Sequence, residues 1–325
     1  MPNVVLHASS RDPFFDLPAS FEAALRAALP AGFALEVVRE VAGLGAALRN
    51  ADVYVGWALP PSFAKRSERL RYAYFLQAGV PEGWETATNK AGLAIRFDSA
   101  AGVNADSVAD HALFLVLAGL RGVLSGSLGA GWAPAAHEVA RDPRTMEAVV
   151  FGHGHVGRGV VARLRPLFRE VHVVSHTPHE ASAHEPRIHG FDETEAVVAH
   201  GDVVVLALPS TGESRALFST ERFFERLPRG AIVVNVARGD LLREDDLLAF
   251  LERAPEARYL ADVATPEPYP ADGALLAHPR VLLTPHVAGR RSDLWEGLAR
   301  AASATLGAEL PSLFSEDVDD GGPHP

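Results

Sequence analysis

The chain has 325 residues, of which 48% are hydrophobic and 22% are charged, and its formal net charge is −11. This composition is typical of a globular protein with a length that favours about two domains. The acidic balance argues against a nucleic-acid surface, which needs clustered cations, and the absence of cysteine excludes disulfides and thiolate metal sites.

The N-terminal residues 1–7 lack the basic start and the long apolar stretch of a signal peptide. We therefore interpret them as a first buried strand. The longest apolar run, residues 112–120, is shorter than the roughly 20 residues that a membrane span requires. We therefore expect a cytoplasmic protein with neither membrane nor nucleic acid among its partners.

Short apolar runs alternate with amphipathic segments over the first hundred residues, a pattern typical of an α/β layer structure with a parallel sheet. The predicted helices cover residues 21–29 and 43–48. The predicted strands cover residues 4–7, 34–38, 53–56 and 70–76.

A long helix is expected from Asn104 to Leu120, with Asn104 or Asp106 as its N-cap, and it leads into a second α/β series. Six strands are predicted there, enough for a complete doubly wound sheet. They cover residues 148–151, 171–175, 203–208, 232–236, 259–263 and 281–284.

The end of the chain predicts a last helix over residues 292–310, ended by Pro311, and then a frayed tail. The whole pattern predicts two Rossmann-like α/β domains. Residues 1–103 and 288–325 would form a discontinuous, flavodoxin-like substrate domain. Residues 104–287 would form a doubly wound, parallel-sheet domain for a dinucleotide, and the reaction would take place in the cleft between the two.

A glycine-rich turn, Gly152-His-Gly-His-Val-Gly157, follows the strand at 148–151 and precedes a helix expected over residues 158–165. Such glycines permit a tight turn, let the backbone approach a pyrophosphate and let the helix pack on the strand. A turn without any ligand is the alternative, but the order of strand, turn and helix favours a dinucleotide. The residues expected to bind it here are Gly152, Gly154, His155, Val156 and Gly157.

The second strand of this series lacks the usual acid. A carboxylate about twenty residues after the glycines ordinarily accepts the adenosine ribose hydroxyl. Here Ser175 and His176 occupy that region, nothing repels a 2′-phosphate, and His176, His179 or Arg187 could contact one. We hypothesise that the cofactor is NADP or NAD, with NADP slightly favoured. The alternative is that these histidines are merely solvated.

Three polar residues follow the glycine turn in short, stiff contexts: Arg238, Glu267 and His286. Arginine offers a planar, permanently charged fork for a carboxylate. Histidine can deliver a proton near neutral pH, and a carboxylate can orient the ring and raise its affinity for that proton. Singly, each residue is typical of a surface ion pair or a loop. Together they fit the reduction of a 2-oxo acid to a 2-hydroxy acid.

The chain resembles the D-isomer-specific 2-hydroxyacid dehydrogenases over essentially its full length. Five stretches carry the likeness, and their order and spacing match. They are Asn104-Ala-Asp-Ser-Val-Ala-Asp-His111, Phe151-Gly-His-Gly-His-Val-Gly-Arg158, Asp202-Val-Val-Val-Leu-Ala-Leu-Pro209, Asn235-Val-Ala-Arg-Gly239, and the stretch from Ala261 through Glu267 to His286.

The resemblance implies an NAD(P)-dependent enzyme that reduces a small 2-oxo acid, such as glyoxylate or hydroxypyruvate, to a D-2-hydroxy acid. Arg238 would bind the substrate, Glu267 would orient His286, and His286 would be the general acid/base. Backbone amides of a loop would grip the substrate carboxylate, and the residues that look like this loop are Ala78, Gly79 and Val80.

The resemblance also implies a homodimer formed through the coenzyme domain, and a nicotinamide pocket. Asp262 would meet the nicotinamide carboxamide, with Ala237 and Pro209 beside it. Two positions depart from the family's pattern. Ser175 replaces the adenosine-ribose carboxylate, and Asp110 stands where glutamate is more usual.

Other interpretations remain open at this stage. Some relatives of this fold are corepressors whose dinucleotide controls assembly, and related enzymes oxidise phosphite or formate. His153 and His155 suggest a metal, but no carboxylate cluster accompanies them, so no metal is expected. His111 is interpreted as a helix-start histidine with a structural hydrogen bond, and Trp57 as a packing residue that could also shape specificity.

Overall fold

The computed structural model describes residues 1–9, 16–57, 59, 61–64, 67–78, 84, 88, 92, 94–124, 140–179 and 186–315. The chain divides into two compact units, Met1–Asn104 with Arg291–Pro325 and Ala105–Arg290. In the described part of the chain, no helix has the length and apolar character needed to cross a membrane. The predicted frayed tail after residue 315 lies outside the described residues.

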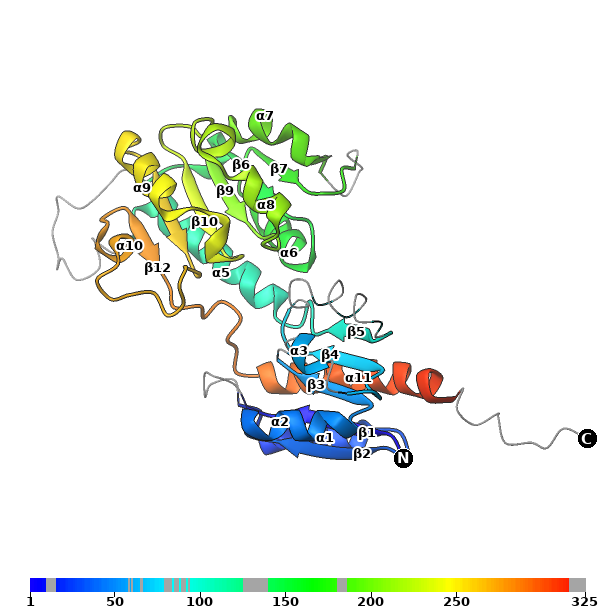
Figure 1. Ribbon diagram of the computed structural model, residues 1–325. Coiled ribbons are helices and arrows are strands. Elements are labelled where there is room, and N and C mark those ends of the chain that lie inside the picture. The colour runs from blue at the N-terminus through cyan, green and yellow to red at the C-terminus, as the bar shows by residue number, and fades with distance from the viewer. Residues whose placement is uncertain are drawn as a thin grey trace, which may run out of the picture. The chain divides into compact units, whose positions relative to one another are not determined.

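The first unit is built on a five-stranded parallel sheet in the order β2-β1-β3-β4-β5 (Figure 1). This is the flavodoxin-like order that the sequence predicts. Its strands are β1 (Asn3–His7), β2 (Ala34–Val38), β3 (Val53–Gly56), β4 (Tyr72–Phe75) and β5 (Arg96–Ser99). Its helices are α1 (Ala19–Ala28), α2 (Val41–Ala47), the 3-10 turn η2 (Leu48–Asn50), α3 (Pro61–Ala64) and α11 (Leu294–Ser315).

The last helix, α11, is longer than the sequence predicts. The prediction ended it at Leu310 because proline removes a backbone donor, but Pro311 lies inside the helix. Beyond it, Phe314 packs against the core of the first unit and meets the Phe33 ring edge to face at 5.3 Å. This burial of apolar surface offsets the lost hydrogen bond, so the helix continues.

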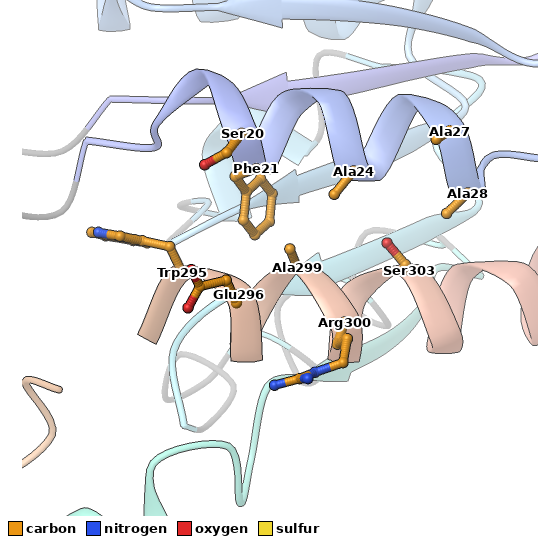
Figure 2. Close-up of a pocket in the computed structure, with 10 residues that line it drawn as sticks. All are labelled: Ser20, Phe21, Ala24, Ala27, Ala28, Trp295, Glu296, Ala299, Arg300 and Ser303. Carbon is orange, nitrogen blue, oxygen red and sulfur yellow. The ribbon is translucent and has the colours of Figure 1, made fainter. Parts of the chain in front are cut away.

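Figure 2 shows α11 running along α1 with a shallow groove of about 410 Å³ between them. Small side chains face it from both helices, and the Phe21 ring points into it. Trp57, a residue considered for substrate specificity, packs edge to face with Trp295 of α11 at 6.2 Å between ring centroids. The groove is mainly apolar, with Glu296 and Arg300 as the charged residues of its lining.

The second unit is built on a seven-stranded parallel sheet in the order β12-β11-β10-β9-β6-β7-β8, the doubly wound topology that the sequence predicts (Figure 1). Apolar clusters cover both faces of this sheet. Its strands are β6 (Glu147–Phe151), β7 (Glu170–Val174), β8 (Ile188–His189), β9 (Val203–Leu206), β10 (Ile232–Asn235), β11 (Arg258–Ala261) and β12 (Val281–Leu283).

The α-helices of the second unit are α5 (Ala105–Arg121), α6 (His155–Leu164), α7 (Thr194–Val198), α8 (Gly212–Leu217), α9 (Glu244–Arg253) and α10 (Ala274–Ala277). Its short helical turns are η4 (Pro143–Thr145), η5 (Phe191–Glu193), η6 (Thr220–Phe224) and η7 (Gly239–Leu241). Helix α6 begins at His155 and not at Arg158, so Gly157 belongs to its first turn.

Candidate active site

The candidate residues of the second unit lie where strands of its sheet end. Because all the strands are parallel, their carboxyl ends meet at one edge, where ligands of doubly wound sheets bind. The residues that follow β6, β7, β9, β10, β11 and β12 are, in that order, Gly152, Ser175, Pro209, Ala237 with Arg238, Asp262, and His286.

The glycine turn after β6 leaves no room for a side chain at two of its three glycines. Gly152 adopts φ +101°, and a Cβ there would come within 2.3 Å of the Ala207 carbonyl oxygen. A Cβ on Gly157 would come within 2.0 Å of the Gly152 carbonyl oxygen, so both positions need glycine. Gly154, by contrast, faces open space at the N-terminus of α6. The backbone there fits an anion held by helix N–H groups, with His155 exposed and Val156 half-buried beside it.

The turn that carries Arg238 is held from inside by Asn235, the last residue of β10. Its side-chain oxygen accepts from the Ala237 N–H at 3.0 Å, and its amide nitrogen donates to the Arg238 carbonyl at 2.9 Å. A Cβ on the next residue, Gly239, would come within 2.1 Å of the Ala264 carbonyl carbon. The turn therefore lies directly against the segment that leads to Glu267. Asn235 belongs to the Asn235-Val-Ala-Arg-Gly239 motif, but the motif alone does not indicate that its side chain holds the turn.

Glu267 and His286 are in direct side-chain contact. The Glu267 Oε2 lies 2.7 Å from Nδ1 of His286, and its Oε1 accepts from the Ala264 N–H at 3.1 Å. The side chains keep 39% and 51% of their surface exposed, respectively, so a ligand can reach them. Both peptide bonds that precede the prolines flanking Glu267 are cis.

Electrostatics in this group favour a charged pair. The hydrogen bond to Glu267 raises the pKa of His286 above its ordinary value, although partial burial and the charge of Arg238 act against it. Burial alone would raise the pKa of Glu267, but the hydrogen bonds from His286 and Ala264 and the charge of Arg238 together lower it. Arg238 thus lies close enough to act on both groups.

Arg238 has donors to spare for a ligand. One of its nitrogens, Nη1, donates to the Ala237 carbonyl oxygen at 2.6 Å. No carboxylate forms an ion pair with it among the residues that the structure describes. A guanidinium held in this way beside an imidazole and its carboxylate partner can bind an anionic substrate while the ring exchanges a proton.

Asp262 holds the backbone that presents His286. Its carbonyl oxygen accepts from the His286 N–H at 2.9 Å, and its carboxylate accepts from the Val287 N–H at 2.9 Å and the Ala288 N–H at 2.8 Å. His286 adopts φ +52°, which a side-chain-bearing residue rarely does. Asp262 is 1% exposed, so three successive amides are fixed from within the protein.

The predicted substrate loop lies in the first unit. Ala78 is exposed and follows β4 after a bend, while Gly79 and Val80 lie outside the described residues. The assignment of this loop to the substrate carboxylate therefore stays a prediction.

At the end of β7, Ser175 is half-buried and His176 is exposed. The His176 ring lies 3.7 Å from a carboxylate oxygen of Glu213 on α8 and packs edge to face with Phe191. Arg187, the cation also considered for a 2′-phosphate, pairs with Glu193 at 3.0 Å. Both side chains thus lie beside an acid, which a phosphate would have to displace.

The absence of a metal stays a prediction. In the described part of the chain, Glu147, Glu170 and His172 offer ligand atoms within 4.8 Å of one another. His172 Nε2 lies 3.1 Å from Glu147, which also forms an ion pair with Arg169. The arginine already supplies the positive charge that a cation would bring.

Comparison with known proteins identifies the family. The family model for the D-isomer specific 2-hydroxyacid dehydrogenase, NAD binding domain, matches residues 115–288, which is more than half of the chain. The chain belongs to this family. It is therefore an NAD(P)-dependent oxidoreductase by family, as the sequence resemblance implied.

Among curated members of the 2-hydroxyacid dehydrogenase family, glyoxylate/hydroxypyruvate reductase B of Pectobacterium atrosepticum is 26% identical over 273 residues, covering 81% of this chain and 82% of the relative. A family member from Xanthobacter autotrophicus Py2, solved with NADPH and MES, superposes with a TM-score of 0.76 at 23% identity, covering 97% and 96% of the two chains. An NAD-dependent formate dehydrogenase from Staphylococcus aureus, solved with NAD, superposes with a TM-score of 0.71 at 21% sequence identity, covering 98% of this chain and 97% of the other. At these identities the two structures support the fold alone.

Proposed function

We propose that this protein reduces the 2-oxo group of a small 2-oxo acid, of the glyoxylate or hydroxypyruvate kind, to a D-2-hydroxy acid. The observation that carries the proposal is the 2.7 Å contact between His286 and Glu267 beside a guanidinium that forms no ion pair in the described part of the chain. The similarity to a glyoxylate/hydroxypyruvate reductase supports this substrate class.

Each residue of the group has one task in this proposal. Arg238 binds the substrate carboxylate and polarises the 2-oxo group, and the cofactor supplies the hydride. His286 donates the proton to the oxygen on which negative charge develops, and Glu267 keeps the ring oriented and charged until then. In this proposal backbone amides of residues 78–80 also bind the substrate carboxylate, and of these Gly79 and Val80 lie outside the described residues.

The dinucleotide would lie along the carboxyl edge of the second sheet, with its pyrophosphate at Gly154 and its nicotinamide near Pro209 and Ala237. Asp262 has one lone pair left on Oδ2 for the nicotinamide carboxamide, because Thr284 and Val287 already donate to Oδ1 and Ala288 donates to Oδ2.

NADP as the slightly favoured cofactor, with NAD as the alternative, rests on the missing acid at Ser175. Relatives of this fold have been solved with either cofactor. The acids beside His176 and Arg187 weaken the case for NADP, since a phosphate would have to displace them. Comparing kcat/KM for NADPH and NADH decides the point. A large preference for NADH would reject the NADP proposal.

A homodimer through the coenzyme domain is also proposed, with the domains divided near residues 103–104 and 287–288. Helix α5 supports it, because Phe114 and Leu117 are exposed on α5 and Val123 is exposed just beyond it. An exposed apolar surface of this kind is a common feature of interfaces. A cytoplasmic location stays a prediction from the sequence.

A spectrophotometric screen tests the function. Glyoxylate, hydroxypyruvate, pyruvate and larger 2-oxo acids are offered with NADH and with NADPH, and formate and phosphite are offered with the oxidised cofactors. We expect turnover with a small 2-oxo acid. Oxidation of formate or phosphite alone would assign the same residues to another acid, and cofactor binding without any turnover would favour a corepressor-type binding protein.

A further inference from the structure

His111 belongs to a hydrogen-bonded chain that ends at the backbone of His286. Its Nε2 lies 2.9 Å from Thr284 Oγ1, and Thr284 Oγ1 lies 2.5 Å from Asp262 Oδ1. His111 stands on α5, Thr284 follows β12 and Asp262 follows β11, so three separate elements meet here. The His111 Nε2 is also 3.5 Å from the same Asp262 oxygen.

The direction of each hydrogen bond follows from the available donors and from the distances to the acceptors. The Thr284 hydroxyl has one hydrogen and three potential acceptors: Asp262 Oδ1 at 2.5 Å, the Ala261 carbonyl oxygen at 3.4 Å and, in one tautomer, His111 Nε2 at 2.9 Å. The Asp262 carboxylate is the nearest of the three and is charged, so we assign the hydroxyl hydrogen to it. His111 must then donate, which requires the hydrogen to be on Nε2.

The far end of this chain is the segment that presents the general acid/base. Asp262 receives the N–H groups of His286, Val287 and Ala288, one on its carbonyl and two on its carboxylate. On the same segment, Ser107 of α5 donates to the Ala288 carbonyl oxygen at 2.7 Å. Helix α5 thus holds residues 284–288 at two points.

We propose that His111 is a positioning residue for His286. It donates from Nε2 to Thr284, which commits the Thr284 hydroxyl to Asp262 and so fixes the carboxylate that accepts from the Val287 and Ala288 amides, directly after the left-handed residue His286. In this proposal His111 acts on His286 through Thr284 and Asp262 and not through the substrate. The inference rests on the proposed function for its kinetic consequences, whereas its structural consequences can be measured in a protein without turnover.

Four variants of the full-length protein separate the donor from the bulk of the side chain. His111→Leu removes the donor, whereas His111→Gln offers an amide N–H from a side chain of similar reach. Thr284→Val removes the hydroxyl from a side chain of the same shape, whereas Thr284→Ser keeps it. Thermal unfolding identifies any variant that has lost its fold. If His111→Leu or Thr284→Val does not fold, the conservative variants His111→Gln and Thr284→Ser still test the proposal.

The direct readout is the tautomer of His111, from long-range ¹⁵N–¹H correlation spectra assigned by comparison with His111→Gln. We expect hydrogen on Nε2. A second readout is hydrogen exchange at the amides of residues 286–288, which should be slow in the native protein and in His111→Gln and faster in His111→Leu. A neutral His111 ring protonated only on Nδ1, or unchanged exchange in a folded His111→Leu variant, would overturn the proposal.

The kinetic readout uses the 2-oxo acid and cofactor that the screen identifies. His111→Leu and Thr284→Val should each lower kcat by about tenfold or more, because small displacements of a catalytic group are costly. In both variants the Kd of the reduced cofactor should stay within about threefold of the native value. The conservative variants His111→Gln and Thr284→Ser should retain most of the native kcat.

The double variant His111→Leu/Thr284→Val decides whether the two residues act together. It should be no slower than the worse single variant, because both substitutions break one chain. Additive losses of kcat, or a His111→Gln variant as slow as His111→Leu, would contradict the positioning role of His111. If the native protein reduces no 2-oxo acid, the proposed function fails. The tautomer of His111 and the hydrogen exchange rates of residues 286–288 still test the positioning role of His111 in that case.

Discussion

At the residue scale, the proposed chemistry depends on a histidine whose pKa is raised chiefly by the hydrogen bond to one neighbour, Glu267. Reduction of a 2-oxo acid consumes a proton, so His286 must be protonated when the hydride arrives. Glu267 raises its pKa above the ordinary value. The rate of reduction should therefore be retained at low pH and fall as the pH rises through this raised pKa.

Replacing Glu267 by Gln removes the charge that stabilises the imidazolium, so the pKa of His286 falls. The descending limb of kcat/KM should move to lower pH, and the rate at neutral pH should drop by roughly tenfold or more. Glu252→Gln is a matched control, because Glu252 faces His278 at 3.8 Å in another part of the unit. Identical pH profiles for Glu267→Gln and the native protein would refute the role of Glu267.

Arg238 is expected to act through its planar fork, which lysine does not reproduce. Arg238→Lys keeps the charge but loses the paired N–H groups, so kcat/KM for the 2-oxo acid should fall roughly 10- to 100-fold, the worth of a hydrogen bond to a charged group. Arg243→Lys is the control, since Arg243 lies on the same connection and pairs with Asp246. Equal kinetics for the two variants would contradict the assignment.

At the scale of elements, the site depends on how closely two loops approach. The turn after β10 touches the loop that carries Glu267 through Gly239, where a Cβ would lie 2.1 Å from backbone. The same loop is held at its other end by Tyr269, whose hydroxyl donates to Glu244 at 2.8 Å and accepts from the Leu275 N–H. The distance between guanidinium and carboxylate is thus set by packing.

Gly239→Ala should push these loops apart. We expect a loss of about 1–3 kcal/mol of stability, as for other overpacked sites, together with a larger loss of turnover than of cofactor binding. Urea unfolding and steady-state kinetics measure the two effects. Gly307→Ala in α11 serves as the control, because a Cβ there meets open space. A fully active and stable Gly239→Ala variant would show that the contact does not matter.

The elements that could be predicted from the sequence are those with apolar runs. Two strands were missed, β5 and β8. The first has an Arg-Phe-Asp-Ser sequence with alternating exposure, and the second has two residues. Both lie at sheet edges, where backbone pairing and not side-chain burial defines the strand. A local rule also failed at Pro311, because packing of Phe314 overrides it.

At the candidate site, the predictable part was the set of residues whose chemistry is visible in short motifs. The contacts that hold them were not predictable. His111 and Thr284 are 173 positions apart, and no local pattern indicates that they meet. Such a pair is brought together by the sheet topology, which places the end of β12 beside α5. The predicted substrate loop could not be examined in the same way, because Gly79 and Val80 lie outside the described part of the chain.

At the scale of the whole molecule, the exposed apolar residues of α5 predict self-association. Light scattering after size exclusion should give about twice the chain mass of 34.6 kDa. Phe114→Glu should shift the protein toward the monomer, since a charge at the centre of an apolar interface is costly. Val41→Glu, at an apolar position on α2 in the other unit that is even more exposed, should not. A monomeric native protein would contradict the dimer.

The step on which the proposed function depends is the delivery of a proton by His286 in the reduction of a small 2-oxo acid. Its most direct test is the rate of NADPH or NADH oxidation with glyoxylate and hydroxypyruvate, measured for the native protein and for His286→Ala alongside cofactor binding by fluorescence. The native protein should turn over, and His286→Ala should lose about 10²- to 10⁴-fold in kcat while it still binds the cofactor. A native rate in His286→Ala, or no turnover of any 2-oxo acid by the native protein, would contradict the claim.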